Sequence, residues 1–205
     1  MRGLYAIIDP EVCADPLAIA AAALRGGCAA LQLRAKRLDE SEFLTLGHAL
    51  VRACRTTGVP FFVNDRFELA TDLGADGVHV GQTDAPIETV RERVGPSVAI
   101  GVSTHSLAQA LEAERRGASL IGFGPVFATT TKLNPDPIVG VSGLREVCER
   151  VRIPVIAIGG ITDSNVAEVV AAGAPLVAVI SALARAPDPE RVARSFHRAV
   201  TAPDL

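Results

Sequence analysis

Polar side chains that could bind a phosphorylated ligand follow five short apolar segments of this 205-residue chain. The groups are Gln32, Arg34 and Lys36; Asn64 and Asp65; Asp84; Ser103 and Thr104; and Thr129, Thr130, Thr131 and Lys132. If the apolar segments are parallel strands, their carboxyl ends meet at one face and bring these side chains into one patch. Cations, carboxylates and hydroxyls together suit a phosphorylated substrate and a divalent metal ion.

Two of these groups have an informative spacing. Alternate residues of a strand share a face, so Gln32, Arg34 and Lys36 are expected to line one wall. A structural network of ion pairs is the other interpretation of that arginine and lysine. Asp65 and Asp84 end adjacent predicted strands, so they could share one Mg²⁺, which prefers one or two carboxylates. Each aspartate could instead cap the helix that follows it.

The segment that ends in Thr129, Thr130, Thr131 and Lys132 offers hydroxyls, backbone N–H groups and a cation to a phosphate. The connection over residues 128–141 is long, as is typical of an active-site lid. An ordinary polar surface loop is the alternative. Gly160 and Ile180-Ser181 follow the last two predicted strands, where barrel enzymes often bind phosphate.

The four histidines differ in position. His48 and His197 fall within predicted helices and are expected to be surface or packing residues, and His79 within a strand is expected to be structural. His105 follows a strand end, where it could act as a general acid or base or could simply begin a helix. Its role stays open.

The segments that position these residues alternate between strand-like and helix-like. Strands are predicted over residues 4–8, 29–33, 60–63, 77–80, 98–102, 120–123, 155–158 and 176–180, and helices over 16–24, 40–55, 67–73, 87–94, 107–116, 143–150, 165–172 and 189–200. Near-continuous Val, Ile and Ala indicates strands buried on both faces, and the alternation indicates parallel pairing. We expect one α/β domain over residues 1–205, a single (β/α)₈ TIM barrel. An open doubly wound sheet is the alternative.

The composition argues against several classes of partner. Net charge is -3 with a pI near 5.8, so no basic field favours nucleic acid or anionic lipid. Cys13, Cys28, Cys54 and Cys148 have no C-x-x-C spacing, which favours reduced thiols and a cytoplasmic location. We expect no signal peptide and no transmembrane segment. Apolar residues at 18–24 leave room for a homodimer, although the oligomeric state stays open.

Eight short motifs occur in order over nearly the whole chain. They are Leu4-Tyr5-Ala6-Ile7-Ile8-Asp9, Gln32-Leu33-Arg34-x-Lys36, Asn64-Asp65-Arg66, Gly77-Val78-His79-Val80-Gly81-Gln82-x-Asp84, Gly101-Val102-Ser103, Gly124-Pro125-Val126-Phe127-x-Thr129-x-Thr131-Lys132, Ile158-Gly159-Gly160-Ile161 and Ile180-Ser181-Ala182. In this combination the chain resembles the thiamine phosphate synthase family. The resemblance implies a (β/α)₈ barrel that joins hydroxymethylpyrimidine diphosphate to thiazole phosphate and releases pyrophosphate with Mg²⁺.

The resemblance also implies a role for each motif residue. Gln32, Arg34, Lys36, Asn64, Ser103 and Lys132 would hold the pyrimidine diphosphate, with Arg34, Lys36, Lys132 and Ser103 the catalytic members; Asp65 and Asp84 would hold Mg²⁺; and Thr129, Thr131, Gly160, Ile180 and Ser181 would hold the thiazole phosphate. Two rival functions are a thiazole tautomerase of the related family and a non-catalytic ligand sensor. Whether a carboxylated thiazole is preferred stays open.

Overall fold

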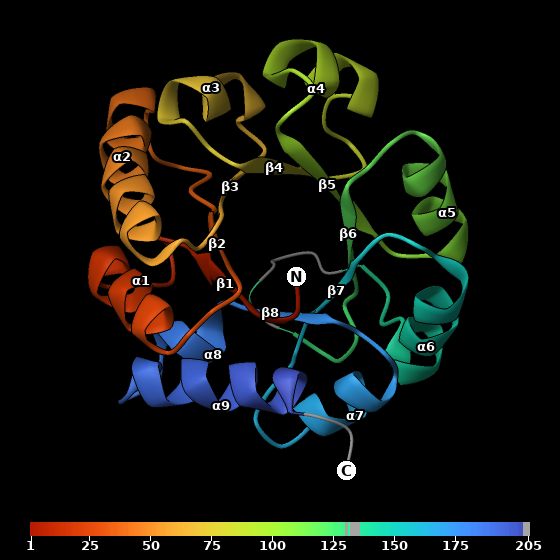
Figure 1. Ribbon diagram of the computed structural model, residues 1–205. Coiled ribbons are helices and arrows are strands. Elements are labelled where there is room, and N and C mark those ends of the chain that lie inside the picture. Colours follow the sequence, from red (N-terminus) through yellow and green to blue (C-terminus); the bar gives the residue numbers. More distant parts are fainter. Residues whose placement is uncertain (130, 132–135, 203–205) are drawn as a thin grey trace.

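The chain folds into a closed barrel of eight parallel strands, each followed by a helical segment on the outside (Figure 1). The computed structural model describes residues 1–129, 131 and 136–202. The strands are β1 (Gly3–Ile8), β2 (Ala30–Leu33), β3 (Phe61–Asn64), β4 (Gly77–Val80), β5 (Ala99–Thr104), β6 (Leu120–Phe123), β7 (Val155–Ile158) and β8 (Leu176–Val179). The predicted TIM barrel is therefore confirmed, and the open sheet is wrong, because β1 pairs with β8.

The helices form a ring around these strands (Figure 1). They are α1 (Pro16–Arg25), α2 (Glu40–Thr57), the 3₁₀ turn η1 (Phe67–Leu69), α3 (Ala70–Leu73), α4 (Ile87–Val94), α5 (Leu107–Arg115), α6 (Gly140–Arg150), α7 (Val166–Ala171), α8 (Ser181–Ala184) and α9 (Pro189–Thr201). Within the described residues, no helix has both the length and the apolar character needed to cross a membrane.

Local sequence signals explain where the helices begin and end. In α2 the Asp39 side chain accepts a hydrogen bond from the Glu42 backbone N–H while the Glu42 carboxylate accepts one from the Asp39 N–H, a reciprocal cap. Gly58 then ends α2 in the left-handed conformation that glycine adopts without strain. Asp188 caps α9, and Pro189 occupies its first turn. These signals are local, which is why most helix boundaries were predictable.

Two apolar layers hold the barrel together. Side chains such as Tyr5, Ile7, Phe62 and Ile156 form a small cluster inside the ring of strands. The intervening residues, such as Leu4 and Leu31, point outward into a larger layer between strands and helices. Burial on both faces accounts for the absence of apolar and polar alternation in the strands.

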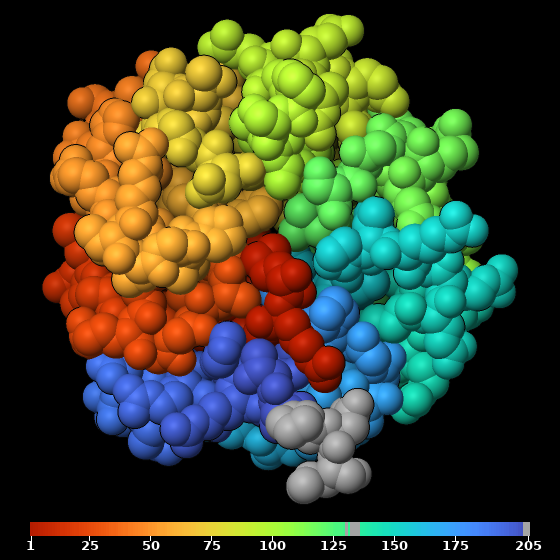
Figure 2. Space-filling model, in the orientation of Figure 1, coloured from red at the N-terminus to blue at the C-terminus, as the bar shows by residue number. Residues whose placement is uncertain are grey.

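The predicted elements differ from the observed ones in a few places. The predicted helix over 67–73 begins as the 3₁₀ turn η1, and α6 begins three residues earlier than expected. The short helix α8 was not predicted, because its four residues carry no periodic pattern. In the space-filling view the first residues, in red, lie over the barrel axis, so this face is the amino-terminal end of the strands (Figure 2).

The cysteines agree with the predicted reduced thiols. All four are free; Cys13, Cys28 and Cys54 are buried, and Cys148 is partly buried. Burial raises the pKa of Cys28 and of Cys54 to about 12, so neither thiol forms a reactive thiolate near neutral pH.

Candidate active site

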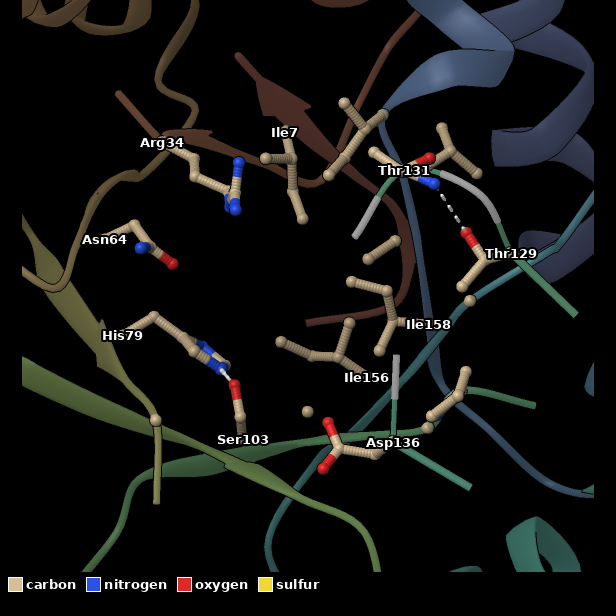
Figure 3. A pocket seen from close by; sticks show the side chains of 18 of the residues that line it. Ile7, Arg34, Asn64, His79, Ser103, Thr129, Thr131, Asp136, Ile156 and Ile158 are labelled. Carbon is tan, nitrogen blue, oxygen red and sulfur yellow. Dashed lines mark hydrogen bonds between the residues drawn. The ribbon is translucent and has the colours of Figure 1, made fainter. Parts of the chain in front are cut away.

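A cavity of about 740 Å³ opens at the carboxyl ends of the strands. Its lining includes every candidate residue from the sequence that the structure describes: Gln32, Arg34, Lys36, Asn64, Asp65, Asp84, Ser103, Thr129, Thr131, Gly160, Ile180 and Ser181. In the close view Arg34, Asn64, His79 and Ser103 lie on one side, Thr129 and Thr131 lie on the other, and Ile7, Ile156 and Ile158 lie between them (Figure 3). The expected convergence of these residues is therefore observed.

Lys132 lies outside the described residues, as does part of the predicted lid. The described part of the connection after β6 stays close to the barrel at its start, where Val126 N–H donates to the Ile158 carbonyl at 2.9 Å. Phe127 N–H likewise donates to the Gly159 carbonyl at 3.0 Å. The loop after β6 is thus anchored on the loop after β7.

A chain of hydrogen-bonded side chains crosses three strands in the wall of the cavity. The fully buried Tyr5 hydroxyl of β1 donates to Gln32 Oε1 at 2.9 Å, and Gln32 Nε2 donates to Asn64 Oδ1 at 3.2 Å. A buried hydroxyl needs a partner, and here the partner is a candidate ligand residue. The chain fixes which way both amides face. Tyr5 was not a predicted site residue, and its signal was a lone tyrosine in an apolar strand.

His79 of β4 lies across the inside of the barrel toward Ser103 of β5. Its Nε2 is 3.1 Å from Ser103 Oγ (Figure 3). Gln82 Nε2 donates to the Ser103 carbonyl at 2.6 Å. The imidazole fits because Gly101 has no side chain; a Cβ there would be 2.4 Å from His79 Nδ1. Burial lowers the pKa of His79 to about 4, so the ring is neutral near pH 7. The structural role expected for His79 therefore includes contact with a candidate site residue.

Two cations of the cavity carry different partners. Arg34 pairs with Asp9, whose side chain is 1% exposed, whereas Lys36 Nζ lies 3.2 Å from Asp65 Oδ2 with the lysine side chain 55% exposed. The Arg34 pair is shielded from water, and the Lys36 pair is not. Both cations therefore have the ion-pair partners that the structural interpretation expects, and both also line the cavity, as the ligand-binding interpretation expects.

Neither Asp65 nor Asp84 caps a helix. The 3₁₀ turn η1 begins at Phe67 and helix α4 begins at Ile87. Their N-cap residues are Arg66 and Pro86, and neither start has a side-chain cap. Asp65 instead has a positive φ of 61°, an unusual conformation for a non-glycine residue, and its side chain faces Lys36. Asp84 Oδ2 accepts from the Gly81 N–H at 2.6 Å.

The two carboxylates fit a magnesium site. Burial raises the pKa of the Asp65 carboxyl above its ordinary value, Lys36 opposes this rise, and the nearby Asp84 adds to it. Two neighbouring carboxylates whose charges repel one another are a suitable donor set for Mg²⁺, which completes its coordination with water and phosphate oxygens. Within the described residues no group of three or more His, Cys, Asp or Glu side chains could hold a metal alone.

Hydroxyl groups and glycine backbone form the other end of the cavity. Thr131 N–H donates to Thr129 Oγ1 at 3.3 Å (Figure 3). Thr131 Oγ1 is 3.5 Å from Ser181 Oγ. Gly160 has φ 65°, and a Cβ there would be 2.3 Å from the Ala128 carbonyl oxygen. Gly160 is therefore required for the close approach of two loops as well as for its own turn.

His105 also lines this cavity. Its Nδ1 lies 2.6 Å from the Gly124 carbonyl oxygen, and its Nε2 lies 3.4 Å from Asp136 Oδ2 in the connection to α6. Because a carbonyl only accepts, Nδ1 carries a proton. Asp136 and Arg185 also line the cavity, and Asp9 lies behind Arg34. None of the three was predicted as a site residue, and no sequence motif indicated Asp136 or Arg185.

Comparison with known proteins gives consistent results. The family described as thiamine monophosphate synthase matches residues 4–183. The thiamine-phosphate synthase of Roseiflexus castenholzii is 45% identical over 198 residues, which cover 95% of this chain and 87% of that protein. That of Roseiflexus sp. is 45% identical over 182 residues, covering 89% and 77%. A solved thiamine phosphate pyrophosphorylase from Pyrococcus furiosus superposes with a TM-score of 0.89 at 38% identity, covering 96% and 94%.

Proposed function

The chain belongs to the thiamine monophosphate synthase family, and we propose that this transferase joins 4-amino-2-methyl-5-hydroxymethylpyrimidine diphosphate to thiazole phosphate, forming thiamine phosphate and pyrophosphate. The observation that supports this proposal most strongly is that all twelve described candidate residues line one and the same cavity. Its volume of about 740 Å³ is within the usual range for small-molecule sites, roughly 300–1,000 Å³.

We assign the end of the cavity near β2 and β3 to the diphosphate. Arg34 and Lys36 bring positive charge, and Asn64 and Ser103 bring hydrogen-bonding groups. Lys36 is paired with Asp65, but the lysine side chain is 55% exposed, so water can replace Asp65 around the ammonium at little cost. A diphosphate can therefore take Lys36 from Asp65. Lys132, which lies outside the described residues, is assigned to the same group from the sequence pattern and the family resemblance.

Asp65 and Asp84 are proposed to hold Mg²⁺ beside that diphosphate. When bound, the ion supplies positive charge to the phosphate oxygens of the leaving group. The Asp84 carboxylate lies close enough to contribute to the raised pKa of the Asp65 carboxyl, and a cation would relieve the repulsion between the two. Chelation of the metal is expected to stop turnover, and added Mg²⁺ is expected to restore it.

The proposed reaction needs no base. The bond between the pyrimidine methylene carbon and the diphosphate oxygen breaks, and its electron pair leaves with the diphosphate. The aminopyrimidine delocalises the positive charge left on carbon, and the thiazole nitrogen then gives its lone pair to form the new C–N bond. The protein accelerates this step insofar as Arg34 and Lys36 hold the departing diphosphate more strongly than the bound ester.

The thiazole phosphate is assigned to the end of the cavity near β7 and β8. Thr129, Thr131 and Ser181 bring hydroxyls to that end, and Gly160 brings a backbone without a side chain. Holding the phosphate there would place the thiazole ring between the two ends of the cavity, over the apolar floor of Ile156 and Ile158 (Figure 3). Positioning of this kind replaces a bimolecular encounter by an effectively unimolecular step.

We propose that the one barrel carries the whole activity and works in the cytoplasm on small-molecule substrates. The free, mostly buried thiols support the location. A homodimer stays a proposal. Ala20 and Ala22–Leu24 of α1 are buried against the rest of this chain, so the exposed Leu17 and Ala18 and the partly buried Ile19 and Ala21 are the apolar residues of α1 that could contact a partner. Sedimentation of the purified protein tests the oligomeric state.

One assay with purified protein separates the candidate functions. Incubation with both substrates and Mg²⁺ is expected to release one pyrophosphate for each thiamine phosphate formed, and omission of either substrate is expected to abolish the product. Isomerisation of a thiazole phosphate without pyrophosphate release would indicate the tautomerase. Binding of the substrates without turnover would indicate the ligand sensor.

A further inference from the structure

A buried carboxylate lies behind Arg34. Asp9 follows β1 directly and is 0% exposed, and its Oδ2 accepts a hydrogen bond from Arg34 Nη1. Arg34 follows β2, and its backbone N–H continues the pairing of the two strands by donating to the Ile8 carbonyl at 2.9 Å. The two residues therefore lie side by side at the carboxyl ends of adjacent strands.

The Asp9 side chain is fixed by its own turn. Its Oδ1 accepts from the Glu11 N–H at 2.9 Å, and its carbonyl accepts from the Val12 and Cys13 N–H groups at 2.9 and 2.8 Å. One carboxylate oxygen is thus held by the backbone, and the other is left for Arg34. Burying a carboxylate away from water costs free energy unless it is paired and hydrogen-bonded. Separating Asp9 from Arg34 would therefore leave a buried charge without a counterion.

The contrast with Lys36 defines what the pair can do. Lys36 is 55% exposed and can exchange Asp65 for a ligand, whereas Arg34 is 22% exposed and its partner 1% exposed. A guanidinium has five N–H donors in a rigid fork, so it can bond to Asp9 and still present donors to the cavity that it lines. Lysine, with a single flexible ammonium, could not do both in a fixed orientation.

We propose that Asp9 is a positioning residue, which holds the Arg34 guanidinium in the orientation that receives the diphosphate. Asp9 touches no substrate and acts only through Arg34. The inference rests on the proposed function, because it assumes that Arg34 binds the diphosphate. This role gives a reason for a buried acidic residue beside a site for a polyanion. The Arg34 side chain loses its conformational freedom during folding, so binding of the diphosphate does not have to order it.

The test compares Asp9→Asn with Glu11→Gln. The asparagine keeps the size of the side chain and an oxygen for the Glu11 N–H, but it loses the charge that holds Arg34. Glu11→Gln removes a carboxylate from the same turn, one that pairs with exposed Arg37 and not with Arg34. We expect Asp9→Asn to lower kcat/KM for the pyrimidine diphosphate by about 10-fold or more, with KM for thiazole phosphate unchanged. Glu11→Gln is expected to match the wild type.

A double-mutant cycle tests whether Asp9 acts through Arg34. In an Arg34→Met background, Asp9→Asn is expected to make no further difference to kcat/KM, because the residue it positions is gone. Equal losses with and without Arg34, or a wild-type KM and kcat in Asp9→Asn, would overturn the inference. Failure of the wild type itself to form thiamine phosphate would instead refute the proposed function.

Thermal unfolding of each variant shows whether a loss of activity comes from a loss of folded protein. Asp9→Ser, which is smaller and also removes the charge, is assayed beside Asp9→Asn with thermal unfolding of each protein. Arg34→Met leaves Asp9 buried without its partner, so Asp9→Asn added to it is expected to raise Tm. A Tm that falls further would contradict the coupling between the two residues even if no single variant were active.

Discussion

Side chains of the cavity are held by one another and by backbone groups. Tyr5 orients Gln32, which orients Asn64, while His79 and Gln82 hold Ser103 from two sides. In the proposed reaction, groups that are fixed in advance would need no reorganisation when charge develops on the leaving diphosphate. At the residue scale, the function therefore depends on partners as much as on the residues that touch substrate.

Asp65→Ala is expected to lower turnover by at least about 10²-fold, the effect of losing one preorganised charge partner. Initial rates with saturating substrates and Mg²⁺ measure it, with circular dichroism to verify the fold. Asp72→Ala is the control, since Asp72 is an exposed aspartate on α3 outside the cavity lining. Wild-type rates in Asp65→Ala would refute the metal-binding assignment.

Gly101→Ala is expected to displace the His79 ring, because the new Cβ would lie 2.4 Å from Nδ1. We expect a stability loss of about 1–3 kcal/mol in urea unfolding, together with slower turnover as Ser103 loses its partner. Gly143→Ala, where the Cβ would meet no atom closer than 3.7 Å, is expected to leave activity unchanged. An active and fully stable Gly101→Ala protein would show that His79 has no part in positioning Ser103.

At the scale of elements, the loops after β6 and β7 behave as one unit. Val126 and Phe127 donate to carbonyls of the β7 end, and Gly159 and Gly160 have no side chains where those loops meet. Thr131 is thereby brought to the Ser181 hydroxyl at the start of α8, and Thr129 accepts a hydrogen bond from the Thr131 N–H. The proposed phosphate site is thus built from three loops, and its geometry depends on their packing.

Gly160→Ala is expected to raise KM for thiazole phosphate, because its Cβ would lie 2.3 Å from the Ala128 carbonyl oxygen and would force the two loops apart. Gly58→Ala is the matched control: Gly58 has a similar φ of 71°, but a Cβ there would meet no atom within 4 Å. Both variants should lose stability through backbone strain, and only Gly160→Ala should change KM. Equal KM values in the two variants would refute the loop argument.

At the scale of the whole molecule, the site exists only if the barrel closes. Closure joins β1 to β8, and α9 covers that junction beside α1 (Figure 1). The buried residues of α9 are Val192, Ala193, Phe196 and Val200. Helix α9 lies beyond residues 4–183, the part of the chain that matches the family. Helix α9 therefore stabilises the pairing of β1 with β8, on which the positions of the cavity residues at the carboxyl ends of the strands depend.

Phe196→Ala is expected to lower the free energy of unfolding by about 3–5 kcal/mol, the usual cost of truncating a buried phenylalanine. Its side chain is 1% exposed in the outer apolar layer. Urea unfolding followed by circular dichroism measures the change. Ser195→Ala, at an exposed neighbouring position, is expected to change stability by less than about 0.5 kcal/mol. A similar loss in both variants would contradict a role for α9 in closing the barrel.

The sequence by itself determined the alternation of elements and the candidate residues at strand ends, because both depend on local pattern. Apolar runs, the capping residue Asp39 and the terminating Gly58 act over a few residues. Whether Asp65 caps a helix or faces a cation was open at that level, since both uses follow from the same position.

Only the tertiary structure decided which side chains contact one another in and around the cavity. Asp9 with Arg34, Tyr5 with Gln32, and His79 over Gly101 join residues of different strands. These contacts depend on the register of the parallel strands and on closure of the barrel. Register and closure set the distances between residues that are far apart in the sequence, and local sequence patterns do not determine those distances.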